Sequence, residues 1–122
     1  MHLPLTLFFL FYAQILWKNR FVNHGAERCL VTIDGVDFDI YEPSPFDSKW
    51  YSHKFGRSGL RYELVVCIKT AKIVAFNGPF PCGKWPDLKI FLSRLKGFLG
   101  VGEKVVADKG YRGDTRVIVP AI

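Results

Sequence analysis

The sequence predicts one α/β domain in which three strands precede a helix and a further strand follows it. Three observations support this fold class. Of the 122 residues, 49% are apolar and 16% are aromatic, which is enough for a folded core. Short runs rich in β-branched residues alternate with breaks that contain glycine and proline. One later segment repeats apolar residues at helical spacing. No linker, internal repeat or low-complexity stretch divides the chain, so its length fits a single domain.

The first strand is predicted over residues 28–34, a β-branched run that ends at Gly35. Residues 36–41 continue it with strict alternation of apolar and polar side chains. The alternation puts Asp37 and Asp39 on the face opposite the apolar residues, where we expect both carboxylates to be exposed to solvent.

The middle of the chain predicts a long loop and then a hairpin. Residues 42–61 contain two prolines, two glycines and many polar residues, and a loop of this length is usually functional. Residues 62–69 and 72–77 are apolar runs separated by only two residues, which predicts an antiparallel hairpin. Residues 78–83 (GPFPCG) are expected to end its second strand.

The helix is predicted to begin at Pro86, since proline is tolerated in the first turn. Apolar residues then recur at helical spacing as far as Leu99, and Gly100 is the expected stop. Residues 104–107 form a short buried strand, and residues 117–119 begin another.

The N-terminal residues 1–17 contain no Asp, Glu, Lys or Arg. They lack the basic region and cleavage site of a signal peptide, and they are marginal in length for a membrane span that also contains Pro4. Three interpretations stay open: a buried helix of the same domain over residues 1–20, a secretory signal or membrane anchor, and a misassigned gene start.

The charge and the cysteine content favour some classes of function and argue against others. The net charge of +6, from 17 basic and 11 acidic residues, favours a polyanionic partner such as nucleic acid or an anionic membrane. The three cysteines form no C-x-x-C pair, which argues against a disulfide framework or a zinc site and favours a reducing compartment. The sequence contains neither a G-x-S-x-G motif nor the G-K-[ST] ending of a phosphate-binding loop.

Two aspartates occupy equivalent positions at the ends of predicted buried strands. Asp34 follows the run VTI, Asp108 follows VVA, and a glycine comes directly or one residue after each. If the two strands are neighbours, both carboxylates emerge at one edge of the sheet. Two close carboxylates repel unless a cation lies between them, and Mg²⁺ prefers such oxygen ligands. Phosphoryl transfer assisted by two metal ions needs this arrangement. The alternative is a pair of aspartates that cap turns.

Four segments follow one another along the chain: CLVTIDGVDFDI, KWYSHKFGRSGLRYELVVCI, GPFPCGKWPDLKIF and GEKVVADKGYRG. In this order they resemble the DDE transposases of the PIF/Harbinger-like kind. Asp34 matches the first acidic residue, which the family carries in an I-D-G-like motif. Tyr51 and Lys54 match a Y-x-x-K segment, and Asp108 begins a D-x-G-Y motif with the second acidic residue. The resemblance covers roughly residues 17–115.

The resemblance implies an RNase H-like mixed sheet with packed helices. It implies that Asp34 and Asp108 are catalytic residues that bind Mg²⁺ or Mn²⁺, for cleavage and strand transfer at DNA phosphodiesters. It implies DNA as the partner, no small-molecule cofactor, and a nuclear location in a eukaryote or a cytoplasmic one otherwise. The family's third acidic ligand, usually a glutamate on a later helix, has no match, since only Asp114 follows Asp108. Residues 21–122 are therefore expected to be a catalytic domain truncated at its C-terminal end, inactive as this fragment.

Basic residues near these motifs are expected to bind the DNA backbone, with interleaved aromatic residues available for stacking. The alternative is a solvated loop whose aromatic residues pack on the core. Asp87, at the predicted helix start, is expected to favour the helix dipole. In some relatives such an aspartate is characteristic without being a metal ligand. The predicted DNA-binding residues are Lys49, Lys54, Arg57, Lys109 and Arg112.

Two other function classes remain open. One is a non-catalytic DNA-binding or interaction module with the same fold. The other is a small membrane-anchored or secreted protein, suggested by residues 1–17.

Overall fold

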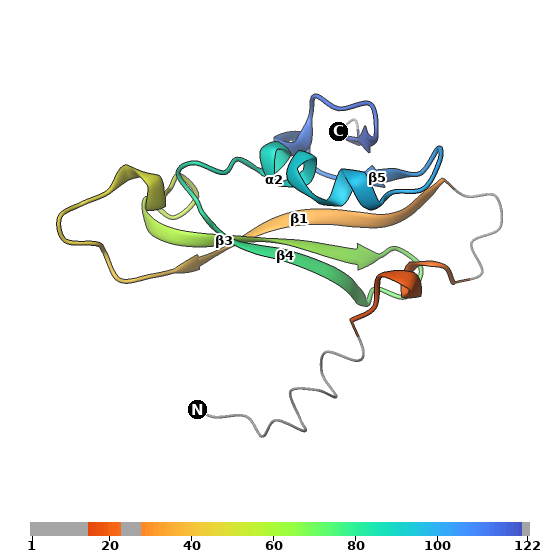
Figure 1. Ribbon diagram of the computed structural model, residues 1–122, viewed down its shortest axis with the longest axis horizontal. Helices are drawn as coiled ribbons and strands as arrows, with labels where there is room; N and C mark the ends of the chain where they lie inside the picture. Colours follow the sequence, from red (N-terminus) through yellow and green to blue (C-terminus); the bar gives the residue numbers. More distant parts are fainter. Residues whose placement is uncertain (1–14, 23–27, 121–122) are drawn as a thin grey trace, which may run out of the picture.

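The computed structural model describes residues 15–22 and 28–120, and every structural statement below concerns those residues (Figure 1). They form six strands, one α-helix and four short 3-10 helices. The strands are β1 (Cys29–Asp39), β2 (Tyr51–Ser52), β3 (Arg57–Cys67), β4 (Ile73–Pro81), β5 (Lys104–Val106) and β6 (Val117–Ile118). The helices are α2 (Asp87–Ser93) and the 3-10 turns η1 (Trp17–Arg20), η2 (Ser48–Trp50), η3 (Leu95–Phe98) and η4 (Lys109–Tyr111).

The strands form one mixed sheet in the order β4-β3-β1-β5-β6, and β2 pairs with the first two residues of β3. Strands β1, β3 and β4 are antiparallel neighbours, whereas β5 and β6 run parallel to β1. A parallel connection needs a crossover, and the segment that contains α2 and η3 supplies it between β4 and β5, lying over one face of the sheet (Figure 1). The expected α/β class with a mixed sheet is therefore confirmed.

The core lies between the sheet and the crossover segment. In β3 every second residue from Gly59 to Cys67 is buried, which is the pattern of a strand with one covered face. The apolar spacing predicted for the helix is also confirmed, since Ile90, Phe91 and Leu95 are buried. The core cluster includes Val31, Ile33, Val65, Val74, Phe91, Leu95, Val105 and Tyr111.

Strand β1 runs through both predicted parts, residues 28–34 and 36–41, without a break, because Gly35 keeps its place in the ladder opposite Glu63 and the strand continues to Asp39. The prediction that Asp34 ends a buried strand is therefore wrong, since Asp34 lies inside β1. The glycine serves packing rather than chain reversal. A Cβ atom at this position would collide with the carboxylate of Asp87, so only glycine leaves room for that side chain.

The predicted loop over residues 42–61 is shorter than expected. Strand β3 begins at Arg57, so this residue belongs to a strand and not to the loop. Glu42 contacts the start of β3, because its carboxylate accepts hydrogen bonds from Ser58 N and Oγ, each at 2.8 Å. The loop also contains η2 and β2.

The hairpin of β3 and β4 is confirmed, but its second strand does not end at residue 78. Strand β4 continues to Pro81, which lies opposite Leu60. The register shifts between Arg61 and Glu63, and this irregularity accommodates Gly78 at φ 145°.

The predicted helix is also shorter than expected. Helix α2 ends at Ser93, because the backbone of Arg94 leaves the helical region (φ −144°, ψ −62°), and η3 continues the segment. The short strands predicted over residues 104–107 and 117–119 are confirmed as β5 and β6.

A buried ion pair joins β1, β3 and the start of α2. Arg61 donates from Nε to Asp37 Oδ1 (2.7 Å) and from Nη2 to Asp37 Oδ2 (2.9 Å), and Ser52 Oγ donates to Asp37 Oδ2 (2.6 Å). Arg61 Nη1 also donates to the carbonyl of Trp85 (2.9 Å), just before α2. Burial by itself would raise the pKa of Asp37, but these hydrogen bonds hold it below its usual value. The prediction that Asp37 is exposed is therefore wrong, whereas Asp39 is exposed as predicted.

Residues 1–14 lie outside the described residues, so the three interpretations of that segment stay predictions. The adjoining turn η1 is joined to the domain by Arg20, whose guanidinium donates to both oxygens of Glu103 at 2.9 and 3.1 Å. No helix in the described part of the chain has the length and apolar character needed to cross a membrane.

We expect Asp37→Ala to lower the free energy of unfolding by about 3 kcal/mol, because it leaves the buried guanidinium of Arg61 without its carboxylate. Urea denaturation measures the loss. Asp39→Ala is the matched control, since it removes an exposed pair with Arg57 on the same strand and should cost less than about 1 kcal/mol. Equal effects of the two substitutions would contradict the assigned role of the buried pair.

Candidate functional site

Parallel pairing of β1 with β5 places the two predicted aspartates at the same region of the sheet. Thr32 lies opposite Val106, and the Thr32 hydroxyl donates to the Val106 carbonyl at 3.0 Å. Asp34 and Asp108 each come two residues later on their own segments, and both are exposed. The prediction that these two strands are neighbours is therefore confirmed. We call this region, defined by Asp34, Asp108 and Asp87, the acidic edge.

Asp108 is held by the turn that follows β5. It precedes η4, and its Oδ1 accepts a hydrogen bond from Gly110 N at 2.9 Å. This bond fixes the carboxylate and leaves lone pairs on the other oxygen for a further partner. Asp34 is exposed between the buried Ile33 and Gly35, so it faces away from the core.

Asp87 brings a third carboxylate to this region. It is the first residue of α2, as predicted, but its side chain is nearly buried rather than solvated. The carboxylate lies against Gly35, and a Cβ atom on Gly110 would be only 2.9 Å from its Oδ2. Burial raises the pKa of Asp87, the charges of Lys54 and Arg61 oppose the rise, and those of Asp108 and Asp34 add to it. Asp87 therefore interacts electrostatically with each of the other two carboxylates.

Sequence reasoning assigned Asp87 to the helix dipole and did not place it at the acidic edge. The available signal was the glycine that follows each of the other two aspartates. Gly35 and Gly110 leave the space into which the Asp87 carboxylate fits.

Three of the five predicted DNA-binding residues lie at the acidic edge. Lys54 Nζ donates to the Gly35 carbonyl at 3.1 Å, and its charge acts on Asp87. Lys109 and Arg112 line a groove of about 620 Å³ together with Asp108. These three side chains place positive charge near the carboxylates.

The other two predicted DNA-binding residues lie elsewhere. Arg57 forms an ion pair with Asp39 (3.2 Å), which is roughly 17 Å along β1 from Asp34 at the usual rise per residue. Lys49 lies in η2, near Asp47 (3.7 Å) and over the ring of Trp50 (5.2 Å). Their roles stay predictions, and this geometry does not associate them with the acidic edge.

Two further polar groups are buried behind the acidic edge. Glu63 and Tyr111 are fully buried, and neither the Glu63 carboxyl nor the Tyr111 hydroxyl has a hydrogen-bond partner in the described part of the chain. Burial raises the pKa of Glu63 to about 7; the charge of Asp87 adds to the rise, and the nearby Tyr111 hydroxyl opposes it. Burial raises the pKa of Tyr111 as well. Sequence reasoning missed Glu63, because it sits in an ordinary strand pattern, and it identified Tyr111 only as the last residue of the D-x-G-Y motif.

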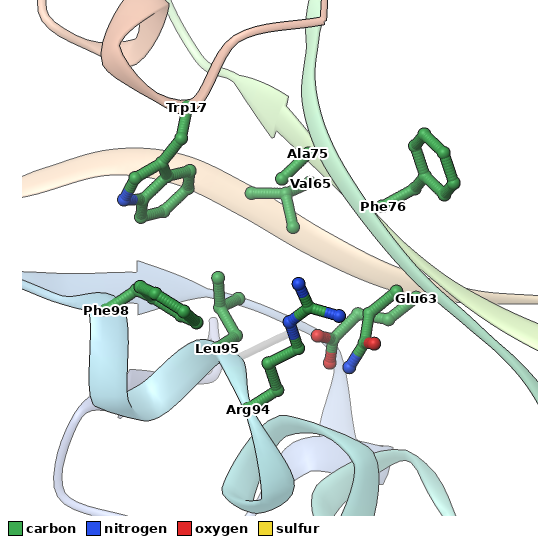
Figure 2. A pocket seen from close by; sticks show the side chains of 9 residues that line it. Trp17, Glu63, Val65, Ala75, Phe76, Arg94, Leu95 and Phe98 are labelled. Atoms are coloured by element: carbon green, nitrogen blue, oxygen red, sulfur yellow. The ribbon is translucent and has the colours of Figure 1, made fainter.

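Glu63 also forms part of a small cavity of about 210 Å³ (Figure 2). The side chain of Arg94 approaches it from the crossover segment, and Leu95 lies beside Arg94 (Figure 2). Apolar side chains form most of the remaining wall. They are Trp17, Val65, Ala75, Phe76 and Phe98.

The residues present suit a hard divalent cation only in part. Mg²⁺ is commonly bound through one or two carboxylates, with water and substrate phosphates as the remaining ligands, which matches Asp34 and Asp108. Within residues 15–22 and 28–120, no three His, Cys, Asp or Glu side chains are grouped so that they could hold a metal ion. Asp114 is the last acidic residue of the sequence, and its carboxylate accepts hydrogen bonds from Lys96 Nζ (2.6 Å) and Arg116 N (2.8 Å).

Comparison with known proteins finds one informative relative among curated sequences. Over 100 residues the chain is 29% identical to a probable transposase for insertion sequence element IS702 from Microchaete diplosiphon. The chain is similar to a transposase. The match includes 82% of this chain and 35% of the relative, so the chain spans about a third of that protein's length. The similarity supports a relationship to transposases in general and does not distinguish the PIF/Harbinger-like group. No family model and no solved structure matches.

Glu63→Gln should change the pH dependence of stability. The pKa of Glu63 is about 7 in the folded chain against a usual value of 4.5, so ionisation of the buried carboxyl lowers stability progressively as the pH rises from 4.5 to about 7. Below pH 4.5 the group is protonated in both states and this loss is absent. We therefore expect the stability of the variant relative to the native chain to rise by about 3 kcal/mol between pH 4 and pH 8, as measured by urea denaturation.

Glu42→Gln is the control of opposite sign. Hydrogen bonds from the backbone and hydroxyl of Ser58 lower the pKa of Glu42, so its stabilising contribution is present above the usual value and is lost as the pH falls. If the difference in the free energy of unfolding between Glu63→Gln and the native chain does not vary with pH, the raised pKa assigned to Glu63 is wrong.

Proposed function

We propose that this chain is part of a transposase-derived DNA-processing domain with an RNase H-like fold. In this proposal Asp34 and Asp108 are its metal-binding residues and Mg²⁺ or Mn²⁺ is its cofactor. The observation that carries the proposal is the parallel pairing of β1 with β5, because it brings two exposed carboxylates, 74 positions apart in the sequence, to one region of the sheet.

The strand order supports the proposed fold. An antiparallel set of β1, β3 and β4, followed by a crossover to β5 and β6 parallel to β1, is the arrangement expected of an RNase H-like core. The similarity to a probable transposase supports the other part of the proposal, the relationship to transposases.

The residues of the acidic edge have separate roles in this proposal. A bound divalent ion would polarise a phosphodiester and lower the pKa of a bound water molecule or hydroxyl group. Asp34 and Asp108 would hold the ion, and the hydrogen bond from Gly110 keeps the Asp108 carboxylate oriented. Lys54, Lys109 and Arg112 would bind phosphate oxygens near the carboxylates.

Metal and DNA binding are the activities proposed for the chain by itself. The relative is about three times as long as the matched segment, and the third acidic ligand expected from the resemblance has no counterpart among the described residues. We therefore expect DNA cleavage to require a further acidic residue besides Asp34 and Asp108. Transposases act on DNA inside the cell, so we propose a nuclear or cytoplasmic location.

A second candidate is a non-catalytic DNA-binding module with the same fold. It is favoured by the lack, within the described ranges, of a group of three metal-ligating side chains, and by the excess of basic residues. The two candidates differ in their dependence on metal: a non-catalytic module binds DNA equally well with and without a chelator.

The metal site is tested by Mn²⁺ titration followed by electron paramagnetic resonance. We expect Asp34→Asn and Asp108→Asn each to weaken Mn²⁺ binding more than tenfold, since each removes one of two carboxylate ligands. Asp39→Asn carries the same charge change on an exposed aspartate of β1 and should change the affinity less than twofold. An affinity that is insensitive to both ligand substitutions would refute the proposed metal site.

DNA binding is tested by fluorescence anisotropy over a range of salt concentrations. Lys54→Gln, Lys109→Gln and Arg112→Gln should each weaken binding and reduce the slope of log affinity against log salt concentration by about one, since each removes one phosphate contact. Lys72→Gln is the matched control and should leave the slope unchanged, because Lys72 is an exposed lysine of the β3–β4 connection and was not predicted to bind DNA. If the four variants behave alike, the acidic edge is not the surface that binds DNA.

A further inference from the structure

We propose that Asp87 is a positioning residue of the acidic edge: its buried carboxylate keeps Lys54 in place and strengthens cation binding at Asp34 and Asp108 without being a ligand. The inference rests on the proposed metal site and assigns a role to a residue outside that pair.

The first argument is the packing of the Asp87 side chain. Gly35 directly follows Asp34, and Gly110 lies two residues after Asp108, so the carboxylate contacts the backbone of both segments that carry the ligands. At Gly35 the three nearest atoms to an added Cβ atom all belong to Asp87. The space at this glycine is therefore matched to that one carboxylate.

The second argument is that the charge of Asp87 is only partly compensated. Its Oδ1 is buried and has no hydrogen-bond partner among the residues that the structure describes. The nearest cation is Arg61, with Nε at 3.8 Å, but that guanidinium already donates to both oxygens of Asp37 and to the Trp85 carbonyl. A carboxylate in this setting contributes negative potential to its surroundings.

The third argument concerns Lys54. Its ammonium group donates to the Gly35 carbonyl at 3.1 Å and interacts electrostatically with Asp87 and Asp37. One hydrogen bond leaves two of its three donors free to contact a phosphate oxygen. Asp87 thus contributes, together with Asp37, the negative charge that favours this position of the lysine.

A role as a direct ligand fits the structure less well, since no group of three acidic side chains with metal-binding geometry exists within the described ranges. A role limited to starting α2 does not account for the fit against two glycines. Groups that support the ligands of a metal site typically change its affinity by 10–100-fold when they are replaced.

The test is the affinity of the full chain for Mn²⁺, measured by electron paramagnetic resonance, with thermal melting as a check on folding. Asp87→Asn should weaken Mn²⁺ binding about tenfold and leave a folded domain, because the amide occupies the same space. Asp39→Asn is the control for the loss of one negative charge on the domain. An unchanged affinity in Asp87→Asn would overturn the inference and leave the proposed function intact.

A second variant moves the carboxylate instead of removing it. Gly35→Ala adds a methyl group that displaces Asp87 while the charges and both ligands stay in the sequence. It should weaken Mn²⁺ binding in the native background and have no further effect in the Asp87→Asn background. If the two substitutions act additively, Asp87 does not act through its position.

Two other results have distinct meanings. If Asp87→Asn weakens binding as strongly as Asp34→Asn, Asp87 is a ligand and the positioning role is overturned. If the native chain does not bind Mn²⁺, or Asp34→Asn has no effect, the proposed function and this inference fail together.

Discussion

The buried pair of Asp37 and Arg61 is the interaction on which the arrangement of the acidic edge depends. Its hydrogen bonds connect the end of β1, the middle of β3, the β2 segment through Ser52, and the backbone just before α2. Because the guanidinium meets the Trp85 carbonyl, the pair fixes where α2 begins, and Asp87 is the first residue of that helix. A buried ion pair contributes little net stability, but it is strongly selective for one geometry. Here that geometry is the approach of α2 to Gly35 inside β1 and to Gly110 after β5.

The acidic edge combines two kinds of constraint. Hydrogen bonding between parallel strands sets the relative position of Asp34 and Asp108, whereas side-chain packing against glycine sets the position of Asp87. This arrangement leaves the buried Glu63 carboxyl and Tyr111 hydroxyl without hydrogen-bond partners among the described residues. Unpaired buried polar groups usually lower stability and are found where function requires them.

Much of the fold followed from the sequence because it depends on local pattern. The β-branched runs, the short hairpin connection and the helical spacing predicted the strands, the antiparallel pair and α2. The equivalent settings of Asp34 and Asp108 also predicted their shared edge, although their metal-binding role remains to be tested. Element ends were predicted less well. Gly78 was predicted to break the second strand of the hairpin, but in the structure it remains in β4, where the register shifts.

The remaining features depend on contacts between residues distant in the sequence. Alternation placed Asp37 on a polar face, and nothing nearby in the sequence identified Arg61, 24 positions later, as its partner. The predicted DNA-binding residues lie in different places for the same reason, because contacts between distant residues set their positions. Lys54 reaches Gly35 through the fold of the β2 segment, whereas Arg57, only three positions later, pairs with Asp39.

The register between β1 and β5 also determines how the acidic edge responds to changes in chain length. Side chains alternate between the two faces of a strand, so loss of one residue between Thr32 and Asp34 would turn the Asp34 carboxylate toward the core. Changes of length between β1 and β5 have no such effect when they fall in connecting loops, because the ladder and not the intervening chain sets the alignment. Homologous chains can therefore differ widely in the separation of the two aspartates along the sequence and still present them as neighbours, while a shift of a single position inside either strand abolishes the arrangement.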